Sequence, residues 1–487
     1  MAKADIKEET ELGLKHKKAD FSEWFSEVIA KTGLADIRYN AKGFIVFRPW
    51  SVMSMKQMYR LYEAELERRG HKPALFPALI PEENFRMEAE HVEGFTPEVF
   101  WVESVGNEKL PEKLAMRPTS ETAMYRMYAM WIRSWRDLPF KIYQSCQVWR
   151  HDTKSTRPFI RSREFHWIEG HDAFATKEGA ERQVKEDMEI TEEVMHQEFG
   201  IPFISVQRPE WDKFPGAVHT YAADTLMPDG KVLQQPSTHL LGQNFAKVFN
   251  VTYEDKSGKE QLVWQTCYGP AISRIFASVI ATHGDDRGLI FPFKIAPVQV
   301  IIIPVTPDKA VEKRCKELKE SLSKDFKVEV DLADNTAGWK FNQWEMLGVP
   351  VRLEIGPREV KSKTITICRR DTGKKDSVPE SKIIESIQKT GEDVSKTLKK
   401  RADDWFKNKF QTSKTLQELK KALEKGGFVR VNYCSIDRDG EACADRIKDE
   451  THGQVRGFRI DKKDKPDGKC IVCGKKANCV VYIAKQY

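Results

Sequence analysis

The spacing of apolar positions predicts two amphipathic helices near the start of the chain. In residues 21–31 the apolar positions recur at helical spacing, at Phe21, Trp24, Phe25, Val28 and Ile29. In residues 53–69 they lie on one side of a second helix, at Met55, Met58, Tyr59, Tyr62 and Leu66. Gly70 follows the second helix, at a position where glycine often ends one. Beyond it the pattern predicts alternating short strands and helices as far as Pro292.

A different pattern begins at Val298. The run Val298–Pro304 is almost continuously apolar, which is typical of a strand that is buried on both faces. A helix over residues 309–319 and a further strand over 327–332 follow it, so we predict an α/β unit here. Residues 385–425 are lysine-rich and helical in pattern. Beyond Phe428 the chain carries five of its nine cysteines.

Composition narrows the class of protein. Of 487 residues, 31% are charged and 40% hydrophobic, and the net charge is +7. No apolar run is long enough to span a membrane, and residues 1–18 lack the apolar segment of a signal peptide. An odd number of scattered cysteines argues against a disulfide framework. We therefore expect a reduced, cytoplasmic protein, whose positive charge is compatible with a polyanionic partner.

Two predicted antiparallel strands carry the clearest chemistry. The first ends in Arg150-His151-Asp152, the second opens with Arg161 and Phe165, and the loop between them is basic. A guanidinium group can form a forked pair of hydrogen bonds with a phosphate, so this hairpin predicts a clamp for a nucleoside triphosphate. Further along, Arg274 lies on a predicted helix that follows Gly269, where a glycine lets the backbone approach a nucleotide closely.

Thr119 and Glu121 form a second candidate site. In a strand or turn, residues two apart point to the same face, and here they offer a hydroxyl and a carboxylate. Both groups accept hydrogen bonds from a cationic amine. The alternative is a helix cap, because Thr or Ser followed by an acid also begins helices. The sequence alone leaves the two interpretations about equal.

Together these blocks resemble the class II aminoacyl-tRNA synthetases and, among them, the prolyl-tRNA synthetases. The resemblance rests on residues 117–121, the Arg150 block, Glu169-Gly170-His171, residues 242–245 and residues 283–286. Residues 70–77 resemble motif 1 of the class, and residues 338–341 and 344–352 extend the likeness into the next unit. It covers nearly the whole chain, in order, and is to the archaeal and eukaryotic-like form.

The resemblance implies a fold of three parts. We expect an α+β class II catalytic core with an antiparallel sheet flanked by helices, then an α/β anticodon-binding domain, and then a small C-terminal zinc-binding α+β domain. The expected boundaries are 1–20 for a lead-in, 21–294 for the catalytic domain, 295–384 for the anticodon-binding domain, 385–425 for a basic helical linker and 426–487 for the cysteine-rich domain. It also implies a homodimer that binds tRNA(Pro), and neither DNA nor a membrane.

The resemblance also assigns an activity and its residues. The enzyme would activate L-proline with ATP and Mg²⁺ and pass the prolyl group to the 3′ end of tRNA(Pro). Proline would be held by Thr119, Glu121, Arg150 and His239. ATP would be bound by Arg150, Asp152, Gln234, Ser237 and Arg274. Arg150 and Arg274 are the expected catalytic residues, because they would neutralise charge as the phosphorus reacts.

The sequence departs from the family at three places. Asp152 stands where a glutamate is more usual, residues 235–238 replace a glycine-rich Thr-Ser run, and Leu240 replaces a second histidine. Residues 165–264 are too few to hold the editing insertion of the bacterial form. A small apolar pocket separates ligands that differ by one methylene by only about 1–3 kcal/mol. We therefore expect measurable activation of alanine or cysteine.

Two further groups have open alternatives. Phe341 would stack on an anticodon base, while Glu345 and Arg352 would read base edges, as single-stranded loops are recognised; the alternative for Phe341 is core packing. The thiols of Cys434, Cys443, Cys470 and Cys473 would hold a structural Zn²⁺. The alternatives there are a redox dithiol and substitution of Cys479 as a ligand.

Two other functions compete with the preferred one. A class II relative for another small amino acid is disfavoured by the Thr119–Glu121 pair and by residues 339–352. A non-catalytic tRNA-binding paralogue would be expected to lose the phosphate-binding arginines, and both Arg150 and Arg274 are present.

Overall fold

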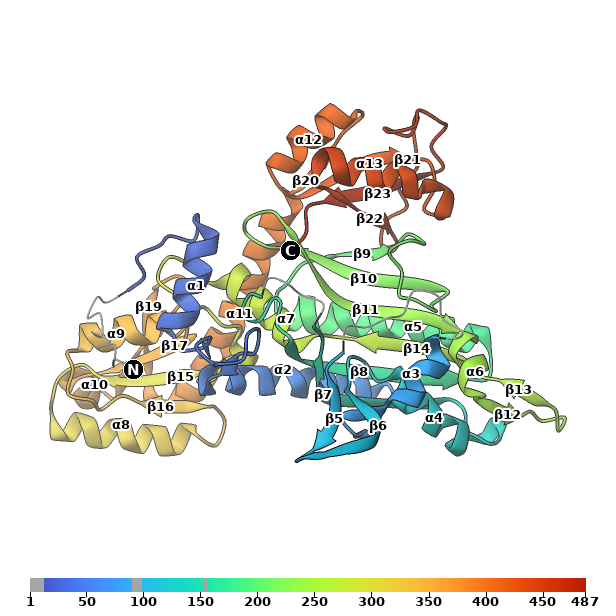
Figure 1. The fold of residues 1–487 in the computed structure, drawn as a ribbon. Coiled ribbons are helices and arrows are strands. Elements are labelled where there is room, and N and C mark those ends of the chain that lie inside the picture. The colour runs from blue at the N-terminus through green and yellow to red at the C-terminus, as the bar shows by residue number, and fades with distance from the viewer. Residues whose placement is uncertain (1–12, 90–98, 152–155) are drawn as a thin grey trace. The chain divides into compact units, whose positions relative to one another are not determined.

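The computed structural model describes residues 13–89, 99–151 and 156–487, and its chain divides into two compact units. The first contains residues up to 36, 47–54 and 279–400, and the second contains 37–46, 55–278 and 401–487. Figure 1 shows the elements of both units, and each unit is described by itself.

The second unit is built on one sheet of eleven strands, ordered β20-β21-β23-β22-β9-β10-β11-β14-β8-β7-β3. All neighbouring strands are antiparallel except for the pairs β3–β7 and β20–β21. Their bounds are Lys72–Pro73 (β3), Phe140–Trp149 (β7), Glu164–Phe174 (β8), Ile204–Gln207 (β9), His219–Leu226 (β10), Val232–Gly242 (β11), Trp264–Gly269 (β14), Phe410–Thr412 (β20), Phe428–Tyr433 (β21), Gln454–Arg459 (β22) and Cys479–Ala484 (β23). The antiparallel sheet predicted for the catalytic core is confirmed.

Helices and small sheets surround this sheet. Helix α5 packs on β11, β14 and β8, and continues as a π-helical stretch, Glu192–Glu198. The helices are α3 (Glu82–Ala89), α4 (Glu121–Trp131), α5 (Lys177–Thr191), α6 (Asn244–Phe249), α12 (Leu416–Glu424) and α13 (Glu441–Thr451). A three-stranded sheet and a hairpin are formed by β4 (Leu79–Pro81), β5 (Trp101–Val105), β6 (Glu108–Met116), β12 (Thr252–Glu254) and β13 (Glu260–Leu262). Short 3-10 turns are Trp135–Asp137 and Arg438–Gly440.

The first unit contains the predicted α/β sheet, ordered β16-β15-β17-β18-β19. Strand β15 is parallel to β16 and β17, and every residue of β15 and β17 is buried, as the apolar run at 298–304 predicted. The strands are β15 (Val300–Pro304), β16 (Val328–Val330), β17 (Val351–Ile355), β18 (Thr364–Arg369) and β19 (Lys375–Pro379). The helices are α1 (Phe21–Lys31), α8 (Lys309–Leu322), α9 (Ala337–Met346) and α10 (Pro357–Ser362), with 3-10 turns at Phe293–Ile295 and Glu380–Lys382. The short strands β1 (Ala35–Asp36) and β2 (Val46–Phe47) pair with each other.

Three helices contribute residues to both units: α2 (Pro49–Arg68), α7 (Ile272–His283) and α11 (Ile383–Lys407). The predicted first helix, 21–31, has the observed bounds. The second begins earlier than predicted, at Pro49, because proline fits the first position of a helix, where no N–H bond is lost. Within the expected linker 385–425, β20 pairs with β21, and Leu419 and Leu423 of α12 are buried in the C-terminal core.

No helix among the described residues is long and apolar enough to cross a membrane.

Candidate active site

Thr119 and Glu121 lie where β6 gives way to α4, and both are almost fully buried, with exposed fractions of 4% and 1%. The Thr119 hydroxyl donates to the Glu121 carboxylate, and the Cys267 thiol donates to the other carboxylate oxygen at 3.3 Å. Ser120 occupies the N-cap position of α4 but makes no capping hydrogen bond. The alternative of a helix cap therefore fails for Thr119 and Ser120, whose hydroxyls bond carboxylates instead.

A buried carboxylate, Glu169, fixes the turn that carries this pair. The Ser120 hydroxyl donates to Glu169 Oε1 at 2.6 Å, and the Ser120 backbone N–H donates to Oε2 at 3.1 Å. His171 Nε2 lies 3.3 Å from Oε2. Burial alone would raise the pKa of Glu169, but the hydrogen bond and charge of His171, with the Ser120 hydroxyl, hold it below its usual value. A charged Glu169 thus holds the backbone of Ser120, between Thr119 and Glu121.

Arg150 follows directly after β7, and two aromatic side chains orient its guanidinium group. Its Nε donates to the Pro118 carbonyl at 2.9 Å, and its guanidinium carbon lies 5.3 Å from the ring centroids of Phe165 and of Trp167. Such stacking holds a guanidinium group in place without neutralising its charge. Asp152, the other predicted nucleotide contact on this loop, lies outside the described residues.

His239 and Ser237 lie on β11 and bond each other. Ser237 Oγ and His239 Nε2 are 3.2 Å apart, and Thr220 Oγ1 lies 2.9 Å from His239 Nδ1. The imidazole is 4.8 Å from the Phe214 ring, centroid to centroid. Burial, with nearby positive charges that include Arg150, lowers the pKa of His239 to about 3. The ring is therefore neutral at physiological pH and presents an uncharged face.

Gln234 and Arg274, two of the residues predicted to bind ATP, are in contact. Arg274, in the first turn of α7, donates to the backbone carbonyl of Gln234 at 3.3 Å. The side-chain oxygen of Gln234 accepts from Arg208 Nη2 at 3.0 Å.

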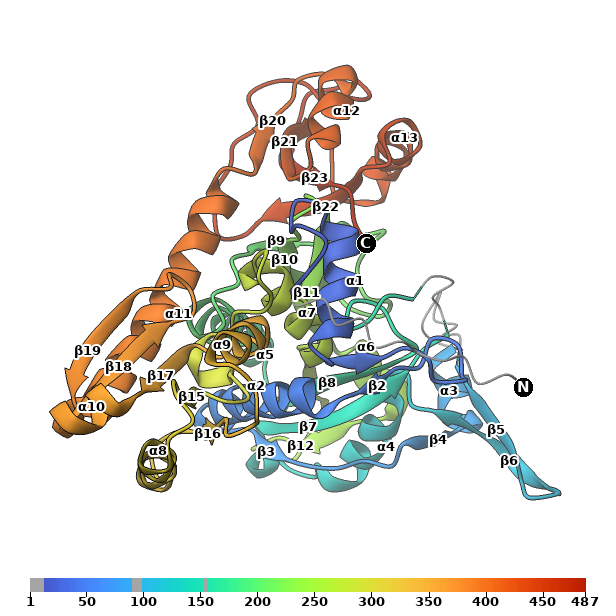
Figure 2. The ribbon, with the colours of Figure 1, turned by 90° about the vertical axis from the view of Figure 1, so that its left-hand side faces the viewer.

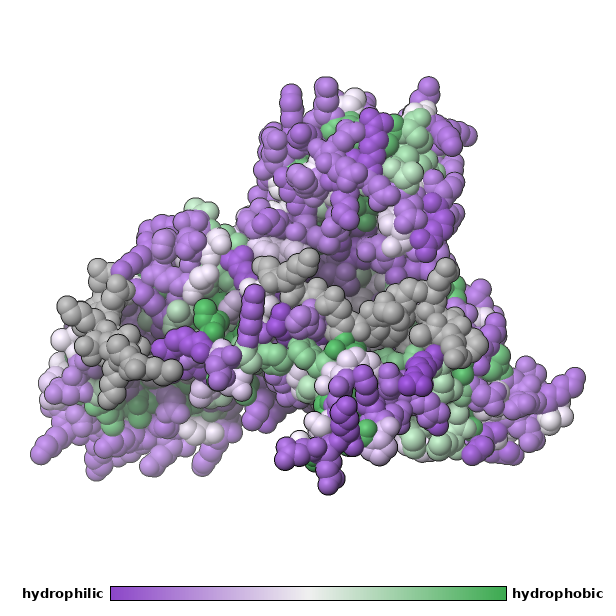
Figure 3. Space-filling view, viewed as in Figure 1, coloured by the Kyte–Doolittle hydropathy of each residue, from purple (hydrophilic) through white to green (hydrophobic). Residues whose placement is uncertain are grey.

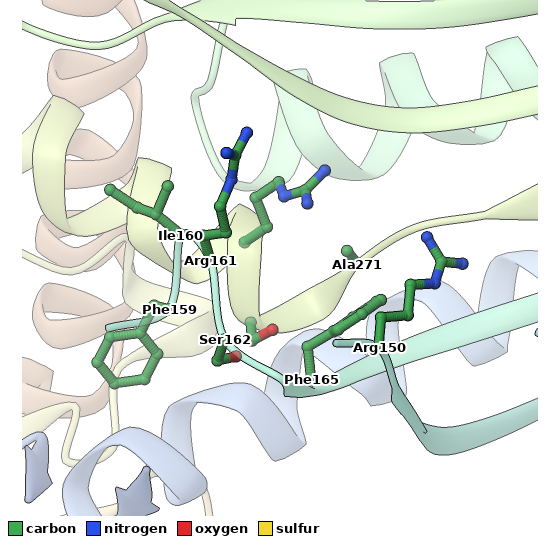
Figure 4. A pocket seen from close by; sticks show the side chains of 9 residues that line it. Arg150, Phe159, Ile160, Arg161, Ser162, Phe165 and Ala271 are labelled. Carbon is green, nitrogen blue, oxygen red and sulfur yellow. The ribbon is translucent and has the colours of Figure 1, made fainter. Parts of the chain in front are cut away.

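Two adjoining cavities collect these residues. One of about 230 Å³ is lined by Thr119, Glu121, Arg150, Gln234, Ser237, His239 and Arg274, among others. The second, of about 220 Å³, shares Arg150, Phe165, Ala271 and Arg274 with it and adds the loop residues Arg161 and Ser162. Figure 4 shows the guanidinium groups of Arg150 and Arg161 extending away from the backbone, with the Phe165 ring beside Arg150. All predicted proline and ATP residues within the described part of the chain therefore line one continuous region.

Several lining residues were not predicted. Trp167, Glu169, Arg208 and Cys267 are brought to the site from β8, the end of β9 and β14. Glu169 was singled out only as part of a motif, and its contact with Ser120 depends on the pairing of distant strands. The aromatic Phe165 and Trp167, two apart on a strand beside Arg150, are the one signal that could have indicated the stacking.

The predicted anticodon residues lie together in the first unit. The guanidinium carbon of Arg352 is 4.1 Å from the Phe341 ring centroid, and Lys375 Nζ is 5.4 Å from it. Arg352 also pairs with Glu345 at 2.8 Å and with Glu354 at 3.0 Å. Phe341 is partly buried against the cluster that contains Ile301 and Ile303. Its ring therefore packs on the sheet and also supports two cations.

The four predicted metal ligands form a compact cluster in the second unit. The sulfur atoms of Cys434, Cys443, Cys470 and Cys473 all lie within 4.8 Å of one another, and Cys434 and Cys443 are 3.8 Å apart. Tetrahedral zinc with bonds of about 2.3 Å places thiolate sulfurs about 3.8 Å apart, so the donor set fits this metal. Cys479 is separate, because its thiol donates to the Tyr433 carbonyl at 3.7 Å. All nine cysteines lie in the described residues as free thiols.

Comparison with known families matches three segments. Residues 100–283 match the tRNA synthetase class II core domain (G, H, P, S and T), residues 299–390 match an anticodon-binding domain, and residues 416–487 match the C-terminal domain of prolyl-tRNA synthetase. The fold and the site thus define a class II aminoacyl-tRNA synthetase.

Relatives narrow the family. The proline–tRNA ligase of Thermofilum pendens is 52% identical over 97% of this chain and 98% of its own, and that of Pyrococcus abyssi is 43% identical over 96% and 98%. The structure of Giardia lamblia prolyl-tRNA synthetase in complex with prolyl-adenylate is 34% identical, covers 98% of this chain and 100% of its own, and superposes with a TM-score of 0.93. The chain belongs to the prolyl-tRNA synthetase family, which confirms the family and the fold expected from the sequence.

Proposed function

We propose that this chain is a proline–tRNA ligase that carries out both steps with the residues described above. In the first step the proline carboxylate attacks the α-phosphorus of ATP, the bond to the bridging oxygen breaks, and pyrophosphate leaves. In the second, the hydroxyl of the 3′-terminal ribose of tRNA(Pro) takes the prolyl group and AMP leaves. No protein nucleophile is required, so catalysis depends on alignment and on stabilisation of charge.

The buried pair Thr119–Glu121 is the observation that carries the proposal. A secondary ammonium has two N–H donors, and the pair offers a hydroxyl and a carboxylate within one cavity. A buried carboxylate is costly unless a cation neutralises it, so the site favours a cationic amine. The neutral His239 and the Phe214 ring lie at the same cavity and would face the apolar ring of proline.

Arg150 and Arg274 are the proposed catalytic residues. Arg150 would contact both the carboxylate of proline and the α-phosphate, and Arg274 would contact the γ-phosphate. Mg²⁺ bound with ATP would supply additional positive charge at the phosphates. Gln234, Ser237 and Asp152 are the further proposed ATP contacts. Loss of one charge-stabilising contact is expected to cost about 3 kcal/mol in the activation step.

The first unit is proposed to read the anticodon of tRNA(Pro). Phe341 would stack on an unpaired base, with Glu345 and Arg352 at base edges. The closeness of Phe341, Arg352 and Glu345 supports this proposal, because one unpaired base could contact all three side chains.

The four-thiol cluster is proposed to hold Zn²⁺ through Cys434, Cys443, Cys470 and Cys473. A backbone hydrogen bond from Lys475 holds the pKa of the Cys473 thiol below its usual value, which favours the thiolate that binds metal. The metal would be structural and would supply no chemistry to the reaction.

A homodimer in the cytoplasm is the proposed state, with tRNA(Pro) as the nucleic-acid partner and no DNA or membrane partner. Exposed apolar side chains support a protein interface, since Leu75 is 85% exposed, Met130 53% and Trp131 45%. Figure 3 shows apolar residues at the surface around α4.

Charging of tRNA tests the proposal. Purified protein with ATP, Mg²⁺ and labelled proline should load a tRNA(Pro) transcript and should load poorly a transcript whose anticodon has been replaced. Arg352→Gln should reduce charging of the native transcript and leave proline-dependent ATP–pyrophosphate exchange unchanged. Exchange without any charging of tRNA(Pro) would contradict the second step, and equal charging of both transcripts would contradict the anticodon assignment.

A further inference from the structure

A buried carboxylate, Asp224, lies between two arginines from distant parts of the chain. Arg208 donates to it through a fork, with Nη1 to Oδ2 at 2.9 Å and Nη2 to Oδ1 at 2.7 Å. Arg456 donates from the other side, with Nε to Oδ2 at 2.8 Å and Nη2 to Oδ1 at 3.1 Å. Burial alone would raise the pKa of Asp224, but the two guanidinium groups lower it to about 2. The carboxylate is therefore ionised, and all its acceptor capacity is used.

Arg456 belongs to the C-terminal part of the sheet. It lies on β22, which pairs with β9 through Phe458–Gln207 and Arg459–Val206, and Figures 1 and 2 both show the two strands side by side. Gly457 allows this close approach, because a Cβ there would lie 1.9 Å from the Gln207 carbonyl oxygen and its φ is +119°. The Arg456 Nη1 also donates to the side chain of Gln486, the penultimate residue.

Arg208 connects this network to the active site. Its Nη2, which bonds Asp224, also donates to Gln234 Oε1 at 3.0 Å, and both Arg208 and Gln234 line the cavity. A guanidinium is only a donor, so the Gln234 atom that faces it must be the oxygen. The NH₂ group of Gln234 then remains available to a substrate in the cavity. This group is a hydrogen-bond donor, which suits the anionic oxygens of a nucleotide.

We propose that Arg456 is a positioning residue for amino-acid activation. By sharing Asp224 with Arg208, it keeps the hydrogen bond from Arg208 to the side-chain oxygen of Gln234. This bond fixes the orientation of the Gln234 amide, so that its NH₂ group is the one available to ATP. The inference rests on the proposed function. Without Arg456, the Asp224 oxygens lose two donors and compete for the Nη2 group of Arg208. Gln234 then loses its partner and its amide is free to rotate. The C-terminal domain thus takes part in building the nucleotide site.

Steady-state ATP–pyrophosphate exchange of the full-length protein tests this, with KM for ATP and KM for proline measured separately. Arg456→Gln should lower kcat/KM for ATP about tenfold, the loss expected when a charged hydrogen-bond partner is removed from a buried network, and leave KM for proline within about twofold. Gln486→Ala, an exposed change that loosens Arg456, should shift KM for ATP in the same direction by about two- to threefold. The matched control is Arg459→Gln on the same strand, whose side chain pairs with Asp461 and should leave both constants unchanged.

Thermal unfolding identifies variants that fail to fold, and Gln486→Ala then carries the test. Unchanged ATP constants in both Arg456→Gln and Gln486→Ala, or equal losses for ATP and proline, would overturn the inference. A wild-type protein without proline-dependent exchange would instead overturn the proposed function, and this inference with it.

Discussion

In the proposed function, Glu121 is the residue on which substrate choice depends most directly. Its carboxylate is held by the Thr119 hydroxyl on one side and by the Cys267 thiol on the other, and the Glu121 side chain is almost fully buried in the wall of the cavity. A charge in such a place interacts strongly with an ammonium group. We therefore expect the pair to select first for a cationic amine, and the shape of the cavity walls to select among amino acids.

Glu121→Gln keeps the size and the acceptor oxygen but removes the charge. We expect kcat/KM for proline to fall about 100-fold, because a charged hydrogen bond of about 2–3 kcal/mol is lost, while KM for ATP changes little. Proline-dependent exchange measures both constants. Glu108→Gln, an exposed glutamate at the start of β6, serves as the control and should behave as the wild type. Unchanged proline kinetics in Glu121→Gln would remove this residue from the pocket.

Residues near in sequence were predictable and residues joined by the fold were not. Thr119 and Glu121 stand two apart in one motif, where their side chains can share a face. Arg150 and Arg274 each lie in a separate local motif that is typical of phosphate binding. Arg208 follows β9, whereas Asp224 lies on β10 and Arg456 on β22, and no local pattern relates the three residues. Cys267 likewise reaches Glu121 only because β14 lies between β11 and β8.

At the scale of elements, α5 carries a buried acid against the sheet. Asp187 accepts from Gln183 at 2.8 Å and from Thr238 at 2.6 Å, and burial, with the charge of Asp172, raises its pKa to about 7. The folded protein therefore binds a proton here between about pH 4 and 7, where the unfolded chain has released it. The free energy of unfolding contributed by Asp187 thus falls as pH rises through this window and is constant above it.

Asp187→Asn keeps the group neutral at every pH and should abolish this decline. Relative to the wild type, the variant should gain about 1.4 kcal/mol for each pH unit between 4 and 7. Unfolding of both proteins at several pH values measures the difference, and the exposed Asp439→Asn is the control. A pH-independent difference between Asp187→Asn and the wild type would contradict the protonated state.

The turn that carries Cys470 and Cys473 gives a second prediction for an element. We expect about one Zn²⁺ per chain by elemental analysis, and a charge-transfer band typical of thiolates after substitution with cobalt. Cys473→Ser should lower metal content and the unfolding temperature, whereas Cys479→Ser should leave the metal in place. Loss of zinc in Cys479→Ser would show that this residue is a ligand. A metal-free wild type would favour the redox alternative.

The sequence predicted an element correctly where an apolar pattern repeats over several helical turns. It missed an element that is a strand only through a short pairing with another strand. The bounds of α1 agree with the sequence pattern because five apolar residues define its face. Strand β20 has only three residues, and its pairing with β21 is what makes it a strand. The residues around it follow a lysine-rich helical pattern, so the sequence predicted a helix there.

For the whole molecule, the exposed apolar side chains that follow β3 and lie on α4 predict a second copy of the chain. Sedimentation should give a dimer, and Leu75→Lys together with Met130→Glu should shift it to monomer while far-UV circular dichroism stays unchanged. Ile384→Lys, which replaces another exposed apolar residue, is the control and should remain dimeric. A monomeric wild type at micromolar concentration would contradict the proposal.

The central claim is that this site activates proline through Thr119 and Glu121. ATP–pyrophosphate exchange with each of the twenty amino acids, for the wild type, Thr119→Ala and Glu121→Ala, tests it most directly. We predict exchange dominated by proline, weaker exchange with alanine or cysteine, and loss of the proline signal in both variants. Exchange led by another amino acid, or proline exchange that survives both substitutions, would contradict the account.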